Sequence, residues 1–146
     1  MKKSVRICMC LVVVAATLVL LFGSYEAREK MYYGDQSNFI TENAVVDNII
    51  YDDNKKHLVF WLSEIDELYS DSNFIMRGEN ARVAISNGIL EKIHIGDEIT
   101  FSSAPRYFGD GYLMPIIYIS VGEDVILDFN EGHSNLMDSY KWELFK

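Results

Sequence analysis

The sequence predicts a mainly β protein with short helices, an α+β fold class, preceded by one transmembrane helix. Several short runs of β-branched and aromatic residues follow residue 43, and turn-forming residues separate them, which predicts strands. Residues 7–25 carry no charged side chain, which predicts the membrane helix. At 146 residues the chain has room for one domain and an appendage.

The N-terminus has the pattern of a membrane signal. Lys2, Lys3 and Arg6 make residues 1–6 basic, and the uncharged residues 7–25 follow. As a helix rising about 1.5 Å per residue, this segment reaches roughly 28 Å, close to the thickness of a bilayer's hydrocarbon core. The positions that follow lack the pair of small residues typical of a cleavage site. A retained signal-anchor is therefore favoured, and secretion after signal cleavage is the alternative.

The charge distribution orients the protein at the cell membrane. Basic flanks stay on the cytosolic side, so residues 1–6 are predicted to be cytosolic and the domain extracytoplasmic. The only cysteines, Cys8 and Cys10, lie at the membrane segment. They are interpreted as small apolar membrane residues, with acylation as the alternative. The outer domain therefore has no disulfide and no thiolate for catalysis or zinc binding.

The outer part of the chain is strongly acidic. After residue 30 there are eight basic and twenty acidic residues, a net charge of −12. Such a field repels phosphate backbones, which argues against a nucleic-acid partner. Cations, basic peptides and neutral partners remain electrostatically compatible with the domain.

Residues 26–43 are polar and predict an irregular stalk. Met31, Tyr32 and Tyr33 lie within it, and two placements are open for them. They rest at the lipid interface, where amphipathic rings are favoured, or they pack back onto the domain.

The first half of the domain predicts a hairpin and a third strand. Residues 44–52 and 56–63 are strand-like, and the turn-forming residues 52–55 lie between them. The second of these runs is apolar on both faces, so it is either covered on both sides or exposes an apolar patch. Residues 64–72 predict a loop and residues 73–77 a short strand.

The second half alternates helices and strands. Apolar residues recur on one side of residues 79–93, which predicts a helix with Asn80 as its N-cap and a break at 87–88. A last amphipathic helix is predicted over 135–145, with Asp138 in its first turn. Three further segments predict strands: 98–104, 113–121 and 125–129.

The order of strands and helix over residues 44–121 resembles that of an OB-fold. The features that carry the resemblance are the 44–63 hairpin, a helix between the third and fourth strands, and the step Ile95-Gly96-Asp97-Glu98-Ile99 into the fourth. The chain departs from the pattern by adding strand 125–129 and a C-terminal helix, so a different small barrel or an α+β roll is the alternative. As a whole, the chain also resembles small, singly anchored surface proteins of Gram-positive bacteria.

The organisation that follows has five parts. It comprises a cytosolic basic tail (1–6), a transmembrane signal-anchor (7–25), a stalk (26–43), an OB-like five-stranded β-barrel domain with an extra strand (44–130), and a C-terminal amphipathic helix (131–146).

The sequence predicts no catalytic residue, no metal site and no cofactor. His57, His94 and His133 have no metal-ligand spacing to one another, and no G-x-S-x-G nucleophile elbow is present. The acidic loops at 52–54 and 66–73 do not match a calcium-binding loop and are interpreted as solubilising segments.

One loop is the candidate binding site. The OB resemblance implies that the ligand meets strands two and three and the loops joining strands one to two and four to five. The four-to-five loop contains Arg106, Tyr107, Phe108 and Tyr112, and Trp61 with Val59 on strand two extends the surface. Aromatic faces with one cation suit stacking against sugars or peptide segments. The alternative is structural, because Asp110-Gly111 is a favoured hairpin turn whose flanking rings form a cross-strand pair.

These observations lead to one expectation and two alternatives. The protein is expected to be a non-enzymatic, membrane-anchored extracytoplasmic module that binds a protein, peptide or saccharide. The first alternative is an accessory subunit of a membrane complex that contacts its partners through the transmembrane helix. The second is a hydrolase-like enzyme whose carboxylates converge only in the folded state.

Overall fold

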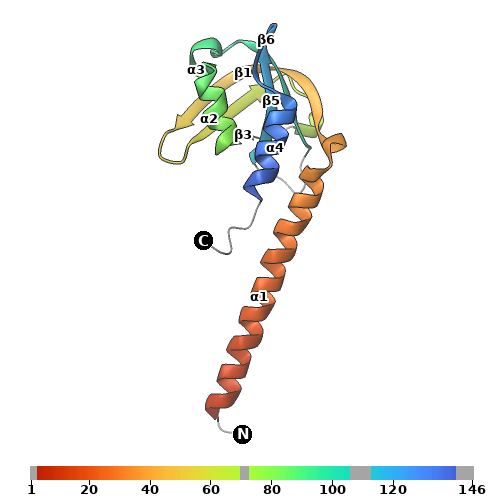
Figure 1. Ribbon diagram of the computed structural model, residues 1–146, viewed down its shortest axis with the longest axis vertical. Coiled ribbons are helices and arrows are strands. Elements are labelled where there is room, and N and C mark those ends of the chain that lie inside the picture. Colours follow the sequence, from red (N-terminus) through yellow and green to blue (C-terminus); the bar gives the residue numbers. More distant parts are fainter. Residues whose placement is uncertain (1–2, 70–72, 106–112, 141–146) are drawn as a thin grey trace.

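A computed structural model describes residues 3–69, 73–105 and 113–140 of the chain. A long helix, α1 (Lys3–Gly34), leads into a rounded body of strands and short helices (Figure 1). A 3-10 turn, η1 (Gln36–Asn38), joins this helix to the first strand, and a second such turn, η2 (Glu67–Tyr69), follows the second strand.

Six strands form one sheet with a closed part. They are β1 (Ile40–Asp52), β2 (His57–Ser63), β3 (Asn73–Arg77), β4 (Glu98–Ser103), β5 (Leu113–Val121) and β6 (Asp124–Leu127). Their order is β3-β2-β1-β4-β5-β6, and a parallel pairing of β3 with β5 closes the first five strands into a barrel. The strand β6 pairs with β5 outside the closed part.

This barrel is consistent with an OB-like fold. A helix lies between β3 and β4, and the C-terminal helix follows the extra strand, as the sequence predicts. The mixed α+β class is therefore confirmed, together with the five-stranded barrel, the additional strand and a C-terminal helix.

The first strand, β1, bends and pairs with two neighbouring strands. Its second half pairs with β2 from Val45 to Asp52, and its first half pairs with β4 from Ile40 to Val45. The ladder to β2 shifts register between Val46 and Asn48, at a bulge that increases local curvature. One long curved strand therefore joins two parts of the barrel wall.

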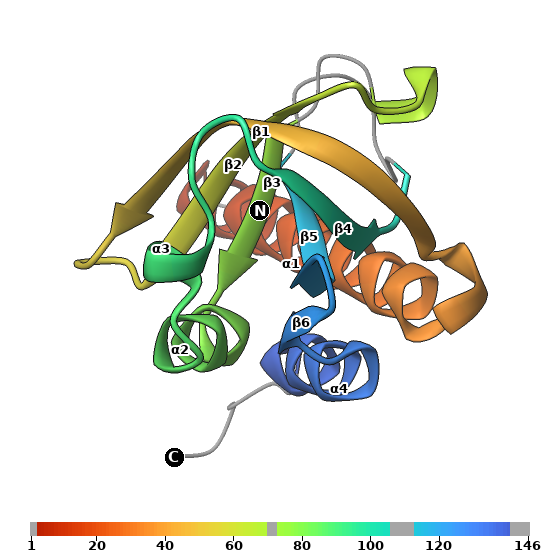
Figure 2. The ribbon, with the colours of Figure 1, turned by 90° about the horizontal axis from the view of Figure 1, so that it is seen from above.

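The helices α2 (Glu79–Ser86) and α3 (Ile89–Lys92) confirm the predicted broken helix. Gly88 lies between them with a φ of +81°, a backbone conformation that glycine adopts without the strain of a side chain. Figure 2 shows both helices and α4 (Phe129–Ser139) along one side of the strands.

Two predicted helix starts are wrong. The N-cap of α2 is Gly78, and Asn80 lies inside the helix with its side chain buried. The last helix begins at Phe129 because Asp128 caps it, its Oδ1 accepting from the N–H groups of Asn130 and Glu131. Asp138 consequently lies in the last turn and not in the first.

The expectation of an irregular stalk is also wrong. Residues 26–34 continue α1, and β1 begins at Ile40, so 35–39 is the whole connection. Tyr33 is buried and Tyr32 is half-buried, whereas Met31 is 78% exposed. The two tyrosines therefore pack onto the body, because the ring surface that they bury outweighs the polar character of the surrounding sequence.

Two apolar clusters stabilise the body. The larger fills the barrel and its α2–α3 side, and Phe60, Phe74 and Phe101 are fully buried in it. The smaller lies outside the barrel and joins Tyr33, Phe39, Ala104, Ile117 and Leu136. The smaller cluster attaches both α1 and α4 to the barrel wall.

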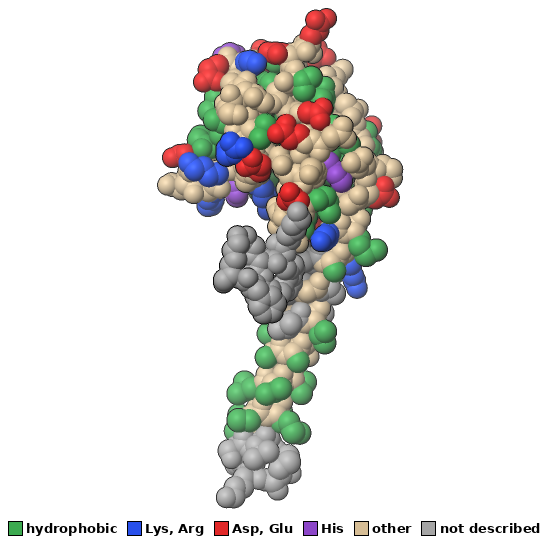
Figure 3. Space-filling model, in the orientation of Figure 1, with side chains coloured by type: hydrophobic (Ala, Val, Ile, Leu, Met, Phe, Trp, Pro, Cys, Tyr) green, Lys and Arg blue, Asp and Glu red, His purple; other side chains and the backbone are tan. Residues whose placement is uncertain are grey.

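The part of α1 that extends away from the body exposes apolar side chains (Figure 3). They are Ile7, Met9, Leu11, Val12, Val13, Val14, Leu18 and Leu20. Among the helices of the described residues, none has the length and apolarity needed to cross a bilayer. The membrane segment over 7–25 is a prediction of the sequence alone.

Candidate binding face

The outward side chains of β2 and β3 form one continuous surface, which we call the β2–β3 face. It consists of His57, Val59, Trp61, Ile75 and Arg77. The register pairs His57 with Arg77 and Val59 with Ile75, so these residues lie on the same side of the sheet. Residues 58, 60 and 62 point into the barrel and are buried, which leaves the alternate residues of β2 partly exposed.

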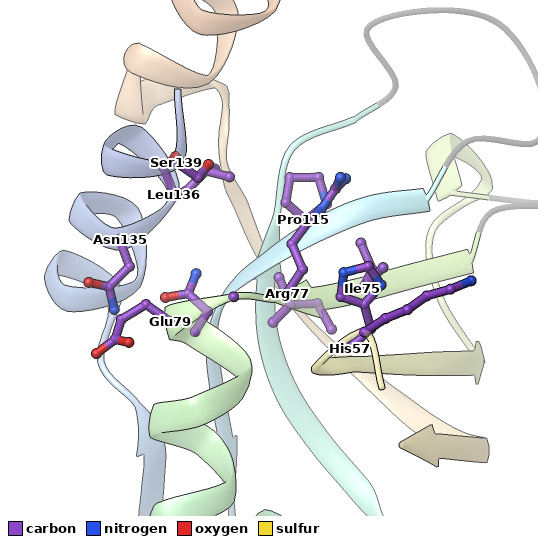
Figure 4. Close-up of a pocket in the computed structure, with 12 residues that line it drawn as sticks. His57, Ile75, Arg77, Glu79, Pro115, Asn135, Leu136 and Ser139 are labelled. Carbon is purple, nitrogen blue, oxygen red and sulfur yellow. Dashed lines mark hydrogen bonds between the residues drawn. The ribbon is translucent and has the colours of Figure 1, made fainter. Parts of the chain in front are cut away.

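A pocket of about 280 Å³ lies at the His57 end of this face (Figure 4). Its strand side is lined by Lys55, His57, Ile75, Arg77 and Pro115. Its helix side is lined by Glu79, Asn80, Asn135, Leu136 and Ser139. The pocket is therefore a gap between the barrel wall and the two helices α2 and α4.

The position of α4 against the barrel depends on a close backbone approach. A Cβ atom on Gly132 would lie 1.9 Å from the carbonyl oxygen of Ile117 on β5. Only glycine permits this distance, so α4 packs directly onto β5 at that point. The next turn of α4 then places Asn135 and Leu136 at the pocket.

Two asparagines in the pocket have unsatisfied amide atoms. Asn80 is 5% exposed, and its Nδ2 donates to the carbonyl oxygen of Gly132 at 2.9 Å. This bond fixes the orientation of the amide, and among the described residues its buried Oδ1 has no hydrogen-bond partner. The buried Nδ2 of Asn135 also has no partner within this part of the chain. Leaving such an atom without a bond costs about 1–3 kcal/mol, so a partner that reached either atom would stabilise this region.

Three cationic or potentially cationic groups border the strand side. Arg77 is exposed and forms no ion pair within the part of the chain that the structure describes. Lys55 lies 4.0 Å from Asp52 in an exposed pair, which has little stabilising effect, and His57 is half-buried. The strand side of the pocket is therefore locally positive on an otherwise acidic domain.

The one carboxylate of the lining is already paired. Both oxygens of Glu79 accept from the guanidinium of Arg82 three residues later. These hydrogen bonds lower the pKa of Glu79 from its ordinary value. The ion pair reduces the negative field that Glu79 directs at the pocket.

The other end of the face is the region of the predicted site. Trp61 is half-buried on β2 and lies opposite Asn48 of β1. The predicted binding residues Arg106, Tyr107, Phe108 and Tyr112 lie outside the described residues. The residues on either side of this loop are described. The carbonyl oxygen of Pro105 accepts a hydrogen bond from the Tyr32 hydroxyl at 2.8 Å, and Leu113 pairs with Asn73 of β3.

The histidines do not come together. His57 lies on the β2–β3 face, His94 pairs with Asp97 in a surface turn, and His133 is buried beside α1. Across residues 3–69, 73–105 and 113–140, no group of three or more His, Cys, Asp or Glu side chains is arranged to hold a metal ion.

The sequence does not single out Asn80, Asn135 or Arg77 as candidate site residues. It predicts Asn80 as a helix cap, although a polar residue among the apolar positions of a helix is the available signal. Nothing in the sequence indicates that Asn135 and Asn80 line the same pocket, because 54 residues separate them and only the packing of α4 on β5 brings them together.

Comparison with known proteins adds no relative. No family model, no curated protein and no solved structure matches this chain. The OB-like description therefore rests on strand order and pairing alone.

Proposed function

We propose that the protein is a membrane-anchored, extracytoplasmic binding module that takes a protein, peptide or saccharide ligand on the β2–β3 face. The observation that carries this proposal is the pocket at one end of the face, where two buried amide atoms have no hydrogen-bond partner among the residues that the structure describes. Preformed concave sites with a few convergent polar groups are the usual places for ligands.

The shape of the face supports this proposal further. His57 borders the pocket, and Val59 and Trp61 follow it along the same side of β2. The ladder between β2 and β3 runs from His57–Arg77 toward Phe60–Phe74, and the end of the 106–112 loop at Leu113 lies beside Asn73. A ligand along this face would extend from the pocket toward Leu113, the residue that follows the aromatic loop predicted from sequence.

The membrane anchor is supported by two properties of α1. Residues 7–25 carry no charge, and eight large apolar side chains of this segment are exposed instead of packed on the barrel: Ile7, Met9, Leu11, Val12, Val13, Val14, Leu18 and Leu20. An exposed apolar surface of this extent is costly in water and is stabilised by lipid. The basic residues Lys2, Lys3 and Arg6 favour a cytosolic N-terminus.

The anchor is tested by fractionation of cells expressing the full chain. We expect the protein in the membrane pellet after alkaline carbonate extraction, with its full mass, and cleaved by protease added outside the cell. Recovery from the medium at a mass that lacks the N-terminal segment would replace the anchor with a cleaved signal. Recovery of the full-length chain in the soluble fraction would contradict both.

The binding face is tested with the full chain reconstituted in nanodiscs and applied to peptide and glycan arrays. We expect binding that Trp61→Ala and Arg106→Ala weaken and that Ile95→Ala leaves unchanged. Ile95 is the matched control because it is a large apolar residue, 68% exposed, in the turn before β4. Equal binding by all three variants with an intact fold would contradict a ligand on this face.

A second candidate function uses the same exposed helix. Apolar side chains around α1 equally suit contact with other transmembrane helices, as in an accessory subunit of a membrane complex. Exchange of residues 7–25 for an unrelated anchor distinguishes the two. The binding module keeps its ligand after this exchange, whereas the accessory subunit loses its association with the complex.

A further inference from the structure

We infer that the pocket between β3, β5, α2 and α4 binds the carboxy-terminal end of a peptide. This inference rests on the proposed function as a binding module and names the ligand class of one part of its face. Four observations carry it: the two unsatisfied amides, a guanidinium that has no ion pair among the described residues, the aliphatic floor and the size of the pocket.

The two asparagines offer one acceptor and one donor. Asn80 Oδ1 can accept from a backbone N–H, and Asn135 Nδ2 can donate to a backbone carbonyl oxygen. The amide of Asn80 cannot exchange these roles, because its Nδ2 is held by the carbonyl oxygen of Gly132. An acceptor and a donor in one pocket match the two polar groups that every residue of a peptide carries.

The cationic side supplies the partner for a carboxylate. Arg77 makes no ion pair among the described residues, and His57 stands opposite it across the β2–β3 ladder. A guanidinium binds a carboxylate through two parallel hydrogen bonds, which is the strongest pairing available to these side chains. Because the rest of the domain is acidic, the guanidinium of Arg77 also favours the end of the ligand peptide that carries the negative charge.

The floor of the pocket favours a peptide over a saccharide. Ile75, Pro115 and Leu136 are buried aliphatic residues, and they line the pocket between the two polar sides. An aliphatic surface suits an apolar side chain, whereas sugars are usually held against the face of an aromatic ring. Among the residues that the structure describes, no tyrosine, tryptophan or phenylalanine lines the pocket.

The volume limits the length of the ligand. A pocket of about 280 Å³ is slightly smaller than the usual range of small-molecule sites, about 300–1,000 Å³. It therefore accommodates the end of a chain and not a long internal segment. The remainder of a longer ligand would leave the pocket along the β2–β3 face toward Trp61.

The test uses the full chain in detergent micelles, with ¹⁵N-labelled side-chain amides, and N-acetyl-Leu-Leu as the probe. We expect saturable shifts of the Asn80 and Asn135 amide resonances with the free carboxylate. The same dipeptide with a carboxy-terminal amide should bind about tenfold more weakly, a difference of about 1.4 kcal/mol. The substitution Arg77→Gln should weaken binding of the free acid to the same extent.

Two variants control for changes in the fold. Lys92→Gln removes a cation on α3 that pairs with Asp124 away from the pocket lining, and it should leave the titration unchanged. Asn135→Ser shortens a half-buried side chain and keeps a donor, so it should fold while binding more weakly. Asn80 is left intact because its bond to Gly132 connects α2 to α4.

Three results would overturn the inference. The first is no saturable shift at millimolar probe, which would mean that water satisfies the two amides. The second is equal binding of the acid and the amide, and the third is a response to maltose in place of the peptide. If array binding depends on Trp61 but not on Arg77, the binding module stands and only this pocket assignment fails.

Discussion

The imidazole Nε2 of His133 lies 2.8 Å from the backbone carbonyl oxygen of Tyr33. The contact joins α4 to the last turn of α1, whose final residue is Gly34. The other ring nitrogen, Nδ1, lies 3.3 Å from Nε2 of Gln36. A ring that donates at Nε2 and accepts at Nδ1 satisfies both contacts. One buried side chain thus couples the orientation of the long helix to the barrel.

Replacement of this histidine should loosen the junction. His133→Ala removes both hydrogen bonds and the ring stacked on Phe129, and we expect a loss of about 1–3 kcal/mol in the free energy of unfolding. The measurement is urea unfolding of the detergent-solubilised full chain. His94→Ala is the control, because its side chain is 69% exposed. Identical midpoints for the two variants would show that the junction adds no stability.

Gly132 should tolerate no side chain. Gly132→Ala places a methyl group 1.9 Å from the Ile117 carbonyl oxygen, so α4 must move away from β5. We expect destabilisation of about 3 kcal/mol or more. Gly34→Ala is the matched control, since its methyl group meets only the Met137 side chain at an ordinary 3.5 Å. Thermal melts followed by circular dichroism compare the two, and equal melting temperatures would contradict the tight contact.

The cap of α4 should have a smaller effect. Asp128→Ala leaves the N–H groups of Asn130 and Glu131 without their side-chain partner, which costs about 1 kcal/mol. Asp128→Asn keeps an accepting oxygen and should retain most of the stability. Urea unfolding of the three proteins measures the difference. A loss of the same size in both variants would assign the effect to charge and not to capping.

Alkaline pH should destabilise the barrel through Tyr69. Burial raises the pKa of its phenol above the ordinary value of 10.0, and the hydroxyl donates to the Ser103 carbonyl oxygen at 2.8 Å. The unfolded chain therefore loses this proton at a lower pH than the folded chain. The stabilising contribution is complete below pH 10 and is lost as the pH rises through the pKa of the folded protein.

The variant Tyr69→Phe tests this pH dependence. It should be about 1 kcal/mol less stable at neutral pH because the hydrogen bond is lost, and its stability should fall less steeply above pH 10. Burial also raises the pKa of Tyr32 and Tyr140. In the variant, the free energy of unfolding therefore still falls with rising pH, but with a smaller slope. Urea unfolding over a series of alkaline buffers gives the slope. An unchanged slope in the variant would exclude Tyr69 as its source.

Local patterns were sufficient for most of the strands. Residues 73–77 and 113–121 are predicted with the bounds that the structure has, because β-branched residues, alternation and turn residues are properties of neighbours in the chain. The break at Gly88 is a local property as well. The helix starts were predicted less well, since Asn80 has the composition of a cap but is used for a tertiary hydrogen bond.

The candidate site depended on contacts between distant residues. The sequence singled out Trp61 and the residues of the 105–112 loop by their aromatic content, and Trp61 does lie on the β2–β3 face. The pocket at the other end of that face could not be predicted. Its lining comes from β3, β5, α2 and α4, and it exists only because α4 approaches β5 at Gly132.

The sequence by itself determined the class of fold, the acidic charge, the order of strands and helices, and the uncharged segment over residues 7–25. These depend on composition and on the periodicity of adjacent residues. Only the tertiary structure decided that the tyrosines after this segment pack onto the body, that β3 and β5 close the barrel, and that Asn80 and Asn135 share a pocket. Long-range packing decides such contacts, because the apolar area that they bury is gained only when segments far apart in the chain come together.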